Sequence, residues 1–169
     1  MRNRIEQLVE QLKLIPHPEG GYYRETYRSE GQIKPDSLDQ SMSGERNYST
    51  AIYFLLTSEN FSAFHRIKSD EVWHFYDGSA IQLHEISPQG EYRSILIGPD
   101  LKKNHQYQYV VPANHWFAAV VSEATSYALV GCTVSPGFDF ADFELVDRSE
   151  LIREFPQHTD LICKFTRDN

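Results

Sequence analysis

The chain has 169 residues, of which 40% are hydrophobic and 13% are aromatic, and this is enough to form a single compact domain over residues 1–169. With 24 acidic and 16 basic residues the net charge is −8, so the basic stripe of a nucleic-acid-binding protein is not expected. The two cysteines are far apart and no apolar segment approaches about 18 residues, which predicts a cytoplasmic, reduced protein that does not insert into a membrane.

The two ends of the chain predict helices. Ile5, Leu8, Val9 and Leu12 repeat at helical spacing, which indicates an amphipathic helix over residues 3–14. The segment "DRSELIREF", followed by a proline, predicts a short C-terminal helix at about residues 148–155. Between the helices, residues 29–47 contain Gly, Pro, Ser and Asp but no aromatic residue, and we expect a long exposed loop that acts as a lid.

The middle of the chain predicts strands. Short segments rich in β-branched and aromatic residues alternate with turn signals, and they cover residues 48–57, 61–67, 71–77, 80–86, 92–98, 106–112, 116–122 and 126–135. This spacing favours an all-β, antiparallel sandwich or barrel over about residues 20–146.

The stretch "FSAFHRIKSDEVWHFYDG" at residues 61–78 carries the first candidate site. Because alternate strand residues share a face, His65 lies with apolar neighbours and Glu71 lies with Trp73, while His74 faces the other way. If both apolar faces line one cavity, His65 and Glu71 meet inside it. The alternative is a buried hydrogen-bonded pair that serves only the structure.

The spacing of this stretch resembles the first motif of the cupin superfamily. His65, Glu71 and Gly78 fall at matching positions, but Ile67 stands where the motif has its second histidine. Likewise "PANHWFAAV" resembles the second motif, with Phe117 in place of the histidine.

The resemblance implies a metal held by three histidines and a glutamate, and this chain lacks two of those ligands. We therefore predict no metal and no other cofactor, since two ligands make neither a structural nor a catalytic site. Substitution by His74 or His115 stays open.

A closer resemblance covers nearly the whole chain. The segments "LIPHPEGGYYRETYRS", "STAIYFLL", "FHRIKSDEVWHFYDG", "VPANHWFAA" and "LVGCTVSPGFDFADFEL" are similar to the group called cupin superfamily protein five. That resemblance implies a double-stranded β-helix, or jelly-roll barrel, usually paired as a homodimer, in a group whose members are functionally uncharacterised.

The chemistry is suggested by a further resemblance, to cupin epimerases of dTDP-4-keto sugars, which use a histidine base and no metal. His65 lies where that base would be, whereas Val130 occupies the place of the tyrosine acid. Tyr22, Tyr23, Tyr53 or Tyr76 stay open as the acid.

These resemblances favour a metal-independent isomerase or epimerase acting on a carbohydrate-like or nucleotide-linked substrate. The alternatives are a non-catalytic module that binds a small polar ligand, and a metal-dependent cupin enzyme.

The predicted site combines these residues. The catalytic group is His65, Glu71 and His74, with Glu71, Asp139 or Asp142 orienting the base. Arg24 is expected either to grip a phosphate or carboxylate or to pair with Glu19 or Glu25 at the surface. The full substrate-binding set is Glu19, Tyr22, Arg24, Trp73, His115, Trp116, Asp139 and Asp142.

Overall fold

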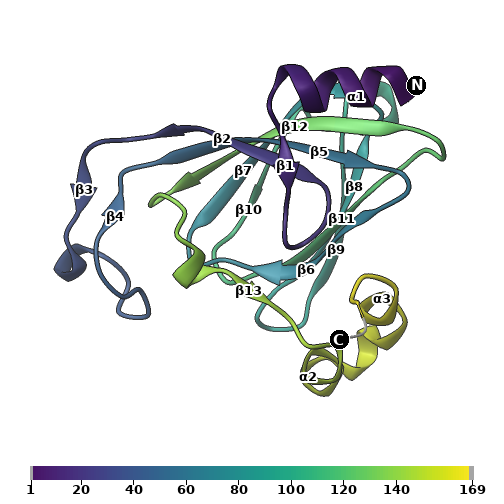
Figure 1. The fold of residues 1–169 in the computed structure, drawn as a ribbon. Coiled ribbons are helices and arrows are strands. Elements are labelled where there is room, and N and C mark those ends of the chain that lie inside the picture. The colour runs from purple at the N-terminus through teal and green to yellow at the C-terminus, as the bar shows by residue number, and fades with distance from the viewer. Residues whose placement is uncertain (1, 168–169) are drawn as a thin grey trace.

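The computed structural model describes residues 2–167 and shows a barrel of two antiparallel sheets with helices against their outer faces (Figure 1). The first sheet has the order β1 (Ile15–Pro16), β2 (Tyr22–Arg28), β5 (Thr50–Thr57), β12 (Tyr127–Ser135), β7 (Asp70–Gly78) and β10 (Gln108–Val111). The second has the order β13 (Glu144–Leu145), β6 (Phe61–Arg66), β11 (Trp116–Val121), β8 (Ile81–Ile86) and β9 (Tyr92–Ile97).

The remaining elements are short. They are the helices α1 (Arg2–Gln11), α2 (Arg148–Glu154) and α3 (Thr159–Lys164), the 3-10 turns η1 (Pro35–Ser37), η2 (Leu101–Lys103), η3 (Phe140–Asp142) and η4 (Pro156–His158), and the small sheet of β3 (Gln32–Ile33) with β4 (Arg46–Asn47). Within residues 2–167, none of the helices combines the length and apolar character that crossing a bilayer requires.

The predicted jelly roll is confirmed, and each of the eight predicted segments coincides with one of the strands β5 to β12 to within two residues at either end. The N-terminal helix ends at Gln11 instead of residue 14, because Lys13 takes a left-handed φ of 53° that a helix does not accommodate. The C-terminal helix begins as expected, since the Asp147 carboxylate accepts from the backbone N–H groups of Ser149 and Glu150. Helix α3 was not predicted.

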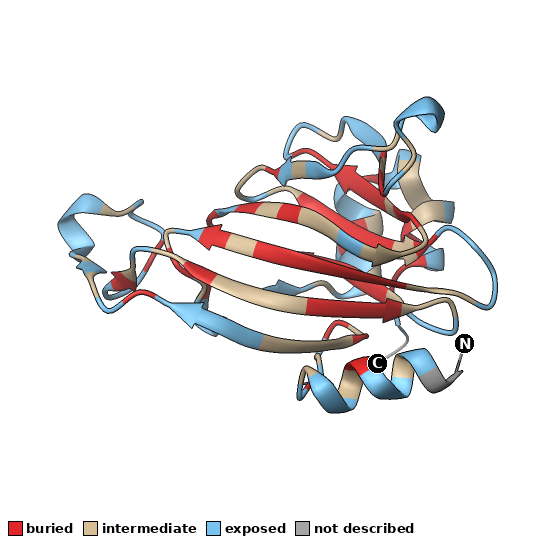
Figure 2. Cartoon of the chain, turned by 90° about the horizontal axis from the view of Figure 1, so that it is seen from above, coloured by how far each residue is buried: buried red, intermediate tan, exposed pale blue. Residues whose placement is uncertain are grey.

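The core forms because each strand presents one apolar face to the opposite sheet. Phe54, Trp73, Phe117 and Val130 meet between the sheets, and Figure 2 shows the buried residues concentrated in the central strands. Helix α1 covers the outer face of the first sheet, whereas α2 and α3 cover the outer face of the second. The expected homodimer and the cytoplasmic location stay predictions.

Residues 29–47 project from the barrel and are mostly exposed, as expected of a lid, but they are not an unanchored loop. Their two ends pair as β3 and β4, and Arg46 donates to both oxygens of Asp142 at 2.7 Å. Both side chains are at least 96% buried. Arg46 also donates to the backbone carbonyls of Ser43 and Glu45, so its guanidinium connects the projecting segment to η3.

Replacing Arg46 by Met leaves the Asp142 carboxylate buried without its main partner, and we expect the free energy of unfolding to fall by about 3 kcal/mol or more. Urea denaturation followed by tryptophan fluorescence measures this change. The matched control is Glu144→Gln, which breaks the exposed pair between Arg66 and Glu144 and is expected to cost less than about 1 kcal/mol. Equal losses in the two variants would show that burial of the Arg46 pair contributes nothing.

Candidate functional site

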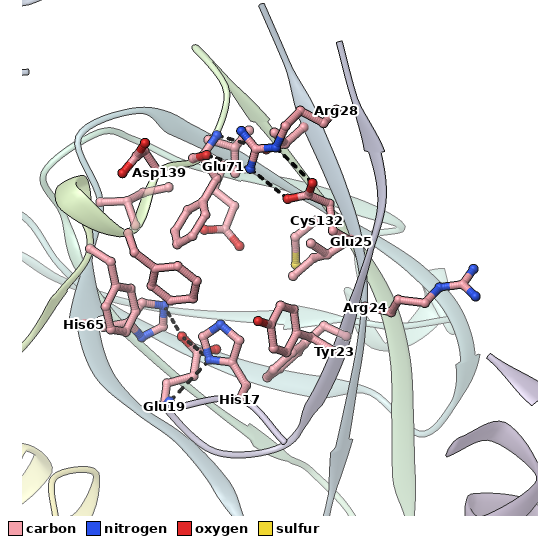
Figure 3. A pocket seen from close by; sticks show the side chains of 18 of the residues that line it. His17, Glu19, Tyr23, Arg24, Glu25, Arg28, His65, Glu71, Cys132 and Asp139 are labelled. Atoms are coloured by element: carbon pink, nitrogen blue, oxygen red, sulfur yellow. Dashed lines mark hydrogen bonds and ion pairs between the residues drawn. The ribbon is translucent and has the colours of Figure 1, made fainter. Parts of the chain in front are cut away.

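A cavity of about 640 Å³ lies inside the barrel, and its wall combines aromatic and acidic side chains (Figure 3). It is bounded by the segment before β2, by the inner faces of β2, β5, β6, β7 and β12, and by the segment around η3. The aromatic residues are Tyr23, Phe54, Trp73, Phe138, Phe140 and Phe143, and the acidic residues are Glu19, Glu25, Glu71 and Asp139.

His65 and Glu19 form a buried ion pair at one wall of the cavity. The Nε2 atom of His65 lies 2.8 Å from Oε2 of Glu19, and Nδ1 donates to the carbonyl oxygen of Ala63 at 2.7 Å. Burial lowers the pKa of His65, but the Glu19 carboxylate outweighs it and the net shift is upward. Since both ring nitrogens are occupied, His65 has no free nitrogen with which to take a proton from a ligand.

The same pair fixes the charge of Glu19. Burial raises the pKa of Glu19, but His65 and the hydroxyl of Ser62, which donates to Oε1 at 2.9 Å, bring the net shift below the ordinary value. The partner of His65 is therefore Glu19, and the expectation that Glu71, Asp139 or Asp142 orients this histidine is wrong.

The turn that delivers Glu19 depends on two adjacent glycines. Gly20 and Gly21 have φ values of 114° and 79°, and a Cβ on Gly20 would lie 2.2 Å from the carbonyl oxygen of Phe61. The Glu19 carbonyl accepts from the backbone N–H of Ala63 and from the guanidinium of Arg167. The Gly-Gly pair was visible in the sequence, but its role in placing a carboxylate against a strand far along the chain was not.

Glu71 lies on the inner face of β7, opposite Val134 of β12 and Val111 of β10. Burial raises the pKa of Glu71 from 4.5 to about 7, with the Glu19 carboxylate adding to the rise and the His65 imidazolium opposing it. The adjacent Cys132 thiol has a pKa raised well above its ordinary value, first by burial and then by Glu71, so it stays protonated. Glu71 is thus a cavity carboxyl group whose charge changes near neutral pH.

His17 and Tyr23 also face the cavity. His17 was not predicted at all, and Tyr23 was one of four tyrosines left open as the acid. The backbone N–H of Glu19 donates to Nδ1 of His17 at 3.3 Å, and the His17 side chain is only 8% exposed. Tyr23 lies on the inner face of β2 opposite Phe54, with its ring 4.6 Å from that of His17. Tyr22, which was predicted to bind substrate, instead packs on the outer face beneath α1.

Six of the predicted residues line the cavity: Glu19, Arg24, His65, Glu71, Trp73 and Asp139. Arg24 contributes little to its interior, because its guanidinium points away and lies 5.9 Å from the ring centroid of Tyr53 on the outer face (Figure 3). The Asp139 carboxylate accepts from the backbone N–H of Ala141 and begins η3.

The other predicted residues lie outside the cavity, and for His74 the reason is that neighbouring strand residues face opposite sides of a sheet. His74 is on the outer face of β7, where it contacts the hydroxyl of Thr133 at 3.1 Å and the amide of Gln108 at 3.0 Å. Both carboxylate oxygens of Asp142 accept hydrogen bonds from the buried guanidinium of Arg46. Neither residue lines the cavity, so both placements are corrected.

The predictions for His115 and Trp116 are corrected in the same way. The Nδ1 atom of His115 lies 2.9 Å from Oε1 of Glu85, outside the cavity wall. Trp116 packs beneath α2 and α3, and the guanidinium of Arg66 covers its ring at 4.2 Å. The aromatic walls come instead from β2, β5, β7 and the segment around η3.

The donor set does not fit a metal of the kind that the cupin motifs imply. Ile67 is a wall residue of the cavity, and the ring of Phe117 lies 4.0 Å from that of His65, so two ligand positions carry only hydrocarbon. His74 and His115 lie outside the cavity. Across residues 2–167, no group of three or more His, Cys, Asp and Glu side chains is arranged to hold a metal ion.

Comparison with known proteins shows both relatives and more distant structural neighbours. An uncharacterized protein of Saccharomyces cerevisiae is 33% identical in an alignment of 147 residues that covers 82% of this chain and 73% of the yeast protein. A crystal structure of a protein from Shewanella oneidensis is 36% identical, with a TM-score of 0.87, and covers 97% of this chain and 98% of that one.

Oxalate decarboxylase from Bacillus subtilis is 12% identical, with a TM-score of 0.55 over 91% of this chain and 37% of its own, and it shares the fold alone. The family model described as Cupin superfamily (DUF985) matches residues 6–146. This match covers most of the chain, and the barrel and the positions of His65 and Glu71 agree with it. The protein therefore belongs to the DUF985 family of the cupin superfamily.

Proposed function

We propose that the cavity binds a small carbohydrate-like substrate and that the chain is a metal-independent isomerase or epimerase with Glu71 as its base. The observation that carries the proposal is Glu71 itself, a cavity carboxyl group with a pKa of about 7. A general base works best when its pKa lies near the working pH, because it is then both available and strong enough to remove a proton.

The size and lining of the cavity support a substrate of this kind. Its volume of about 640 Å³ lies in the range of small-molecule sites, and aromatic side chains of its wall such as Phe140 and Phe143 suit the C–H face of a sugar ring. The carboxylates accept hydrogen bonds from hydroxyl groups. A cavity that offers both surfaces suits a polyhydroxylated molecule better than a purely apolar one.

The His65–Glu19 pair then tunes the base instead of acting as one. Moving the role of base from His65 to Glu71 follows from the hydrogen bonds, since both nitrogens of His65 are engaged. The positive charge of His65 opposes the rise that burial imposes on the pKa of Glu71. Without this charge, Glu71 would remain protonated at neutral pH and could not accept a proton.

A single base suffices for a proton shift between neighbouring carbons on one face of a substrate. Inversion at one carbon also requires a donor on the opposite face. Of the four tyrosines that the sequence left open, Tyr23 lines the cavity, whereas the rings of Tyr53 and Tyr76 lie 6.0 Å apart on the outer face. Tyr23 is therefore the proposed proton donor for an epimerase.

The proposal predicts that the protein exchanges a substrate carbon-bound hydrogen with solvent. We expect deuterium incorporation next to the carbonyl of at least one member of a panel of unphosphorylated aldoses and ketoses incubated with the protein in D₂O, measured by NMR. Glu71→Gln keeps the size of the side chain but removes the base, so the exchange rate should fall by about 10²- to 10⁴-fold.

The control is Glu154→Gln, an exposed carboxylate of α2, which should exchange at the wild-type rate. Undiminished exchange in Glu71→Gln would exclude Glu71 as the base. Saturable sugar binding without exchange would replace the isomerase by the alternative, a non-catalytic binding module.

The raised pKa of Glu71 also predicts how stability depends on pH. The folded state binds this proton more tightly than the unfolded state, so the stabilisation is fully present below the ordinary pKa of 4.5 and is lost as the pH rises to about 7. Between about pH 5 and pH 8, the wild type should lose roughly 2 to 3 kcal/mol of unfolding free energy relative to Glu71→Gln. Urea denaturation across this range measures the difference, and parallel profiles would show that the pKa is not raised.

A further inference from the structure

We propose that His17 binds the carbonyl oxygen of the substrate through a neutral imidazole N–H, and that the substrate is an uncharged α-hydroxy aldehyde or ketone. The inference rests on the proposed function of the cavity and deepens it by naming the carbonyl-binding group and the substrate class.

The hydrogen bonds determine which nitrogen of His17 carries the proton. The backbone N–H of Glu19 donates to Nδ1 at 3.3 Å, whereas the Glu19 carboxylate oxygen Oε2 lies 3.7 Å from the same nitrogen, beyond hydrogen-bond distance. Nδ1 is therefore the acceptor, and a neutral ring carries its proton on Nε2. Figure 3 shows Nδ1 toward Glu19 and the other ring nitrogen directed into the cavity. Among residues 2–167, none forms a hydrogen bond with Nε2, although the side chain is 92% buried. An N–H donor that faces the cavity, on a side chain held by its neighbours and with no protein acceptor, is available to the acceptor atom of a ligand.

The surroundings of His17 hold the ring in place. Tyr23, Phe54 and Phe143 meet it edge-on at ring-centroid distances of 4.6, 6.0 and 6.0 Å, and Phe140 stacks on it at 6.3 Å. Burial lowers the pKa of His17, the nearby His65 imidazolium lowers it further, and the Glu19 carboxylate opposes them. The ring is thus neutral at neutral pH and remains a donor.

The cations of the cavity explain why an uncharged substrate fits. Arg28 donates to both oxygens of Glu25, to the side-chain oxygen of Asn47 and to the carbonyl of Phe138, so its guanidinium is already engaged. Arg24 points away from the cavity (Figure 3). The third Lys or Arg residue of the wall, Lys13, is an exposed residue before β1. Apart from Lys13, a phosphate or carboxylate on the ligand would meet mainly carboxylates and aromatic rings in the cavity. An N–H donor in a site of low polarity instead strengthens its hydrogen bond as negative charge develops on a carbonyl oxygen.

These roles give a balanced step. The Glu71 carboxylate takes the proton from the carbon next to the carbonyl, the C–H electron pair forms the carbon–carbon double bond, and the carbonyl π pair moves to the oxygen held by His17. The hydroxyl proton then shifts between the two oxygens, and Glu71 returns its proton to the former carbonyl carbon. An aldose becomes a ketose with no oxidant, reductant or further reactant.

The tautomer is tested directly by ¹⁵N NMR of the full chain labelled at histidine, with the His17 signals identified by their loss in His17→Phe. We expect a neutral ring at pH 7 with the proton on Nε2. A charged ring, or a proton on Nδ1, would overturn the inference. The measurement is made on the wild type, so it does not depend on whether a variant folds.

The ligand class is tested with erythronohydroxamate, an uncharged polyhydroxy mimic of the enediolate, by isothermal titration calorimetry. We expect the wild type to bind it and His17→Phe to bind about 10-fold or more weakly, while His17→Gln, which keeps an N–H donor, recovers part of the affinity. His158→Phe, whose histidine contacts the carbonyl of Gly90 outside the cavity, should bind as the wild type does. No binding to the wild type, or equal binding by His17→Phe, would overturn the inference.

The two proposals fail in different ways. If sugars exchange deuterium and His17→Phe exchanges at the wild-type rate, the role of His17 is wrong while the isomerase stands. If no sugar exchanges but the hydroxamate binds in a manner that depends on His17, the carbonyl-binding site stands and the isomerase is wrong.

Discussion

The buried ion pair between His65 and Glu19 determines the electrostatics of the cavity. Two charges are held almost out of contact with water, an arrangement that is stable only because each has further hydrogen bonds, from His65 to the Ala63 carbonyl and from Ser62 to Glu19. The same pair connects the Gly-Gly turn before β2 to β6 and so closes one wall of the barrel. Glu71 then faces one negative and one positive group, and its pKa depends on the balance between them.

The loss of metal ligands accounts for much of this arrangement. Where the cupin motifs have histidines, this chain has Ile67 and Phe117, and the ring of Phe117 packs directly on His65. Hydrocarbon side chains at these positions exclude water from the surroundings of His65 and raise the free-energy cost of an ionised group there. The imidazole of His65, which remains among these hydrocarbon side chains, would be neutral unless a carboxylate compensated for its burial. Glu19 supplies that carboxylate from a turn, so an ion pair occupies the region where the motif implies a metal.

The sequence was sufficient to predict the barrel because short segments rich in β-branched and aromatic residues recur between turn signals, and β6 and β7 also alternate between an inner and an outer face. The same alternation correctly separated His65 and Glu71 from His74. It failed in β2, where a choice between Tyr22 and Tyr23 as the inward residue depends on a register that the Gly-Gly turn sets. It also could not predict Glu19, Arg46 or Asp142 as partners, since each pair joins residues at least 43 positions apart through irregular segments. A local sequence pattern predicts which face of a strand a residue lies on, whereas contacts between distant segments depend on the assembled fold.

The charge of the cavity also explains why a neutral group suits the carbonyl-binding role proposed for His17. With His65 protonated and both Glu19 and Glu71 ionised, the three groups carry one net negative charge. When Glu71 accepts a substrate proton, its charge disappears and the substrate oxygen gains one, so the net charge of the enclosed region is unchanged. Moving a charge over a short distance in a medium of low polarity costs far less than creating one. A cationic side chain at the carbonyl site would instead form an ion pair with the Glu71 carboxylate before the substrate binds. Glu71 would then be ionised, but its oxygens would be bound to that cation and not free to take the substrate proton.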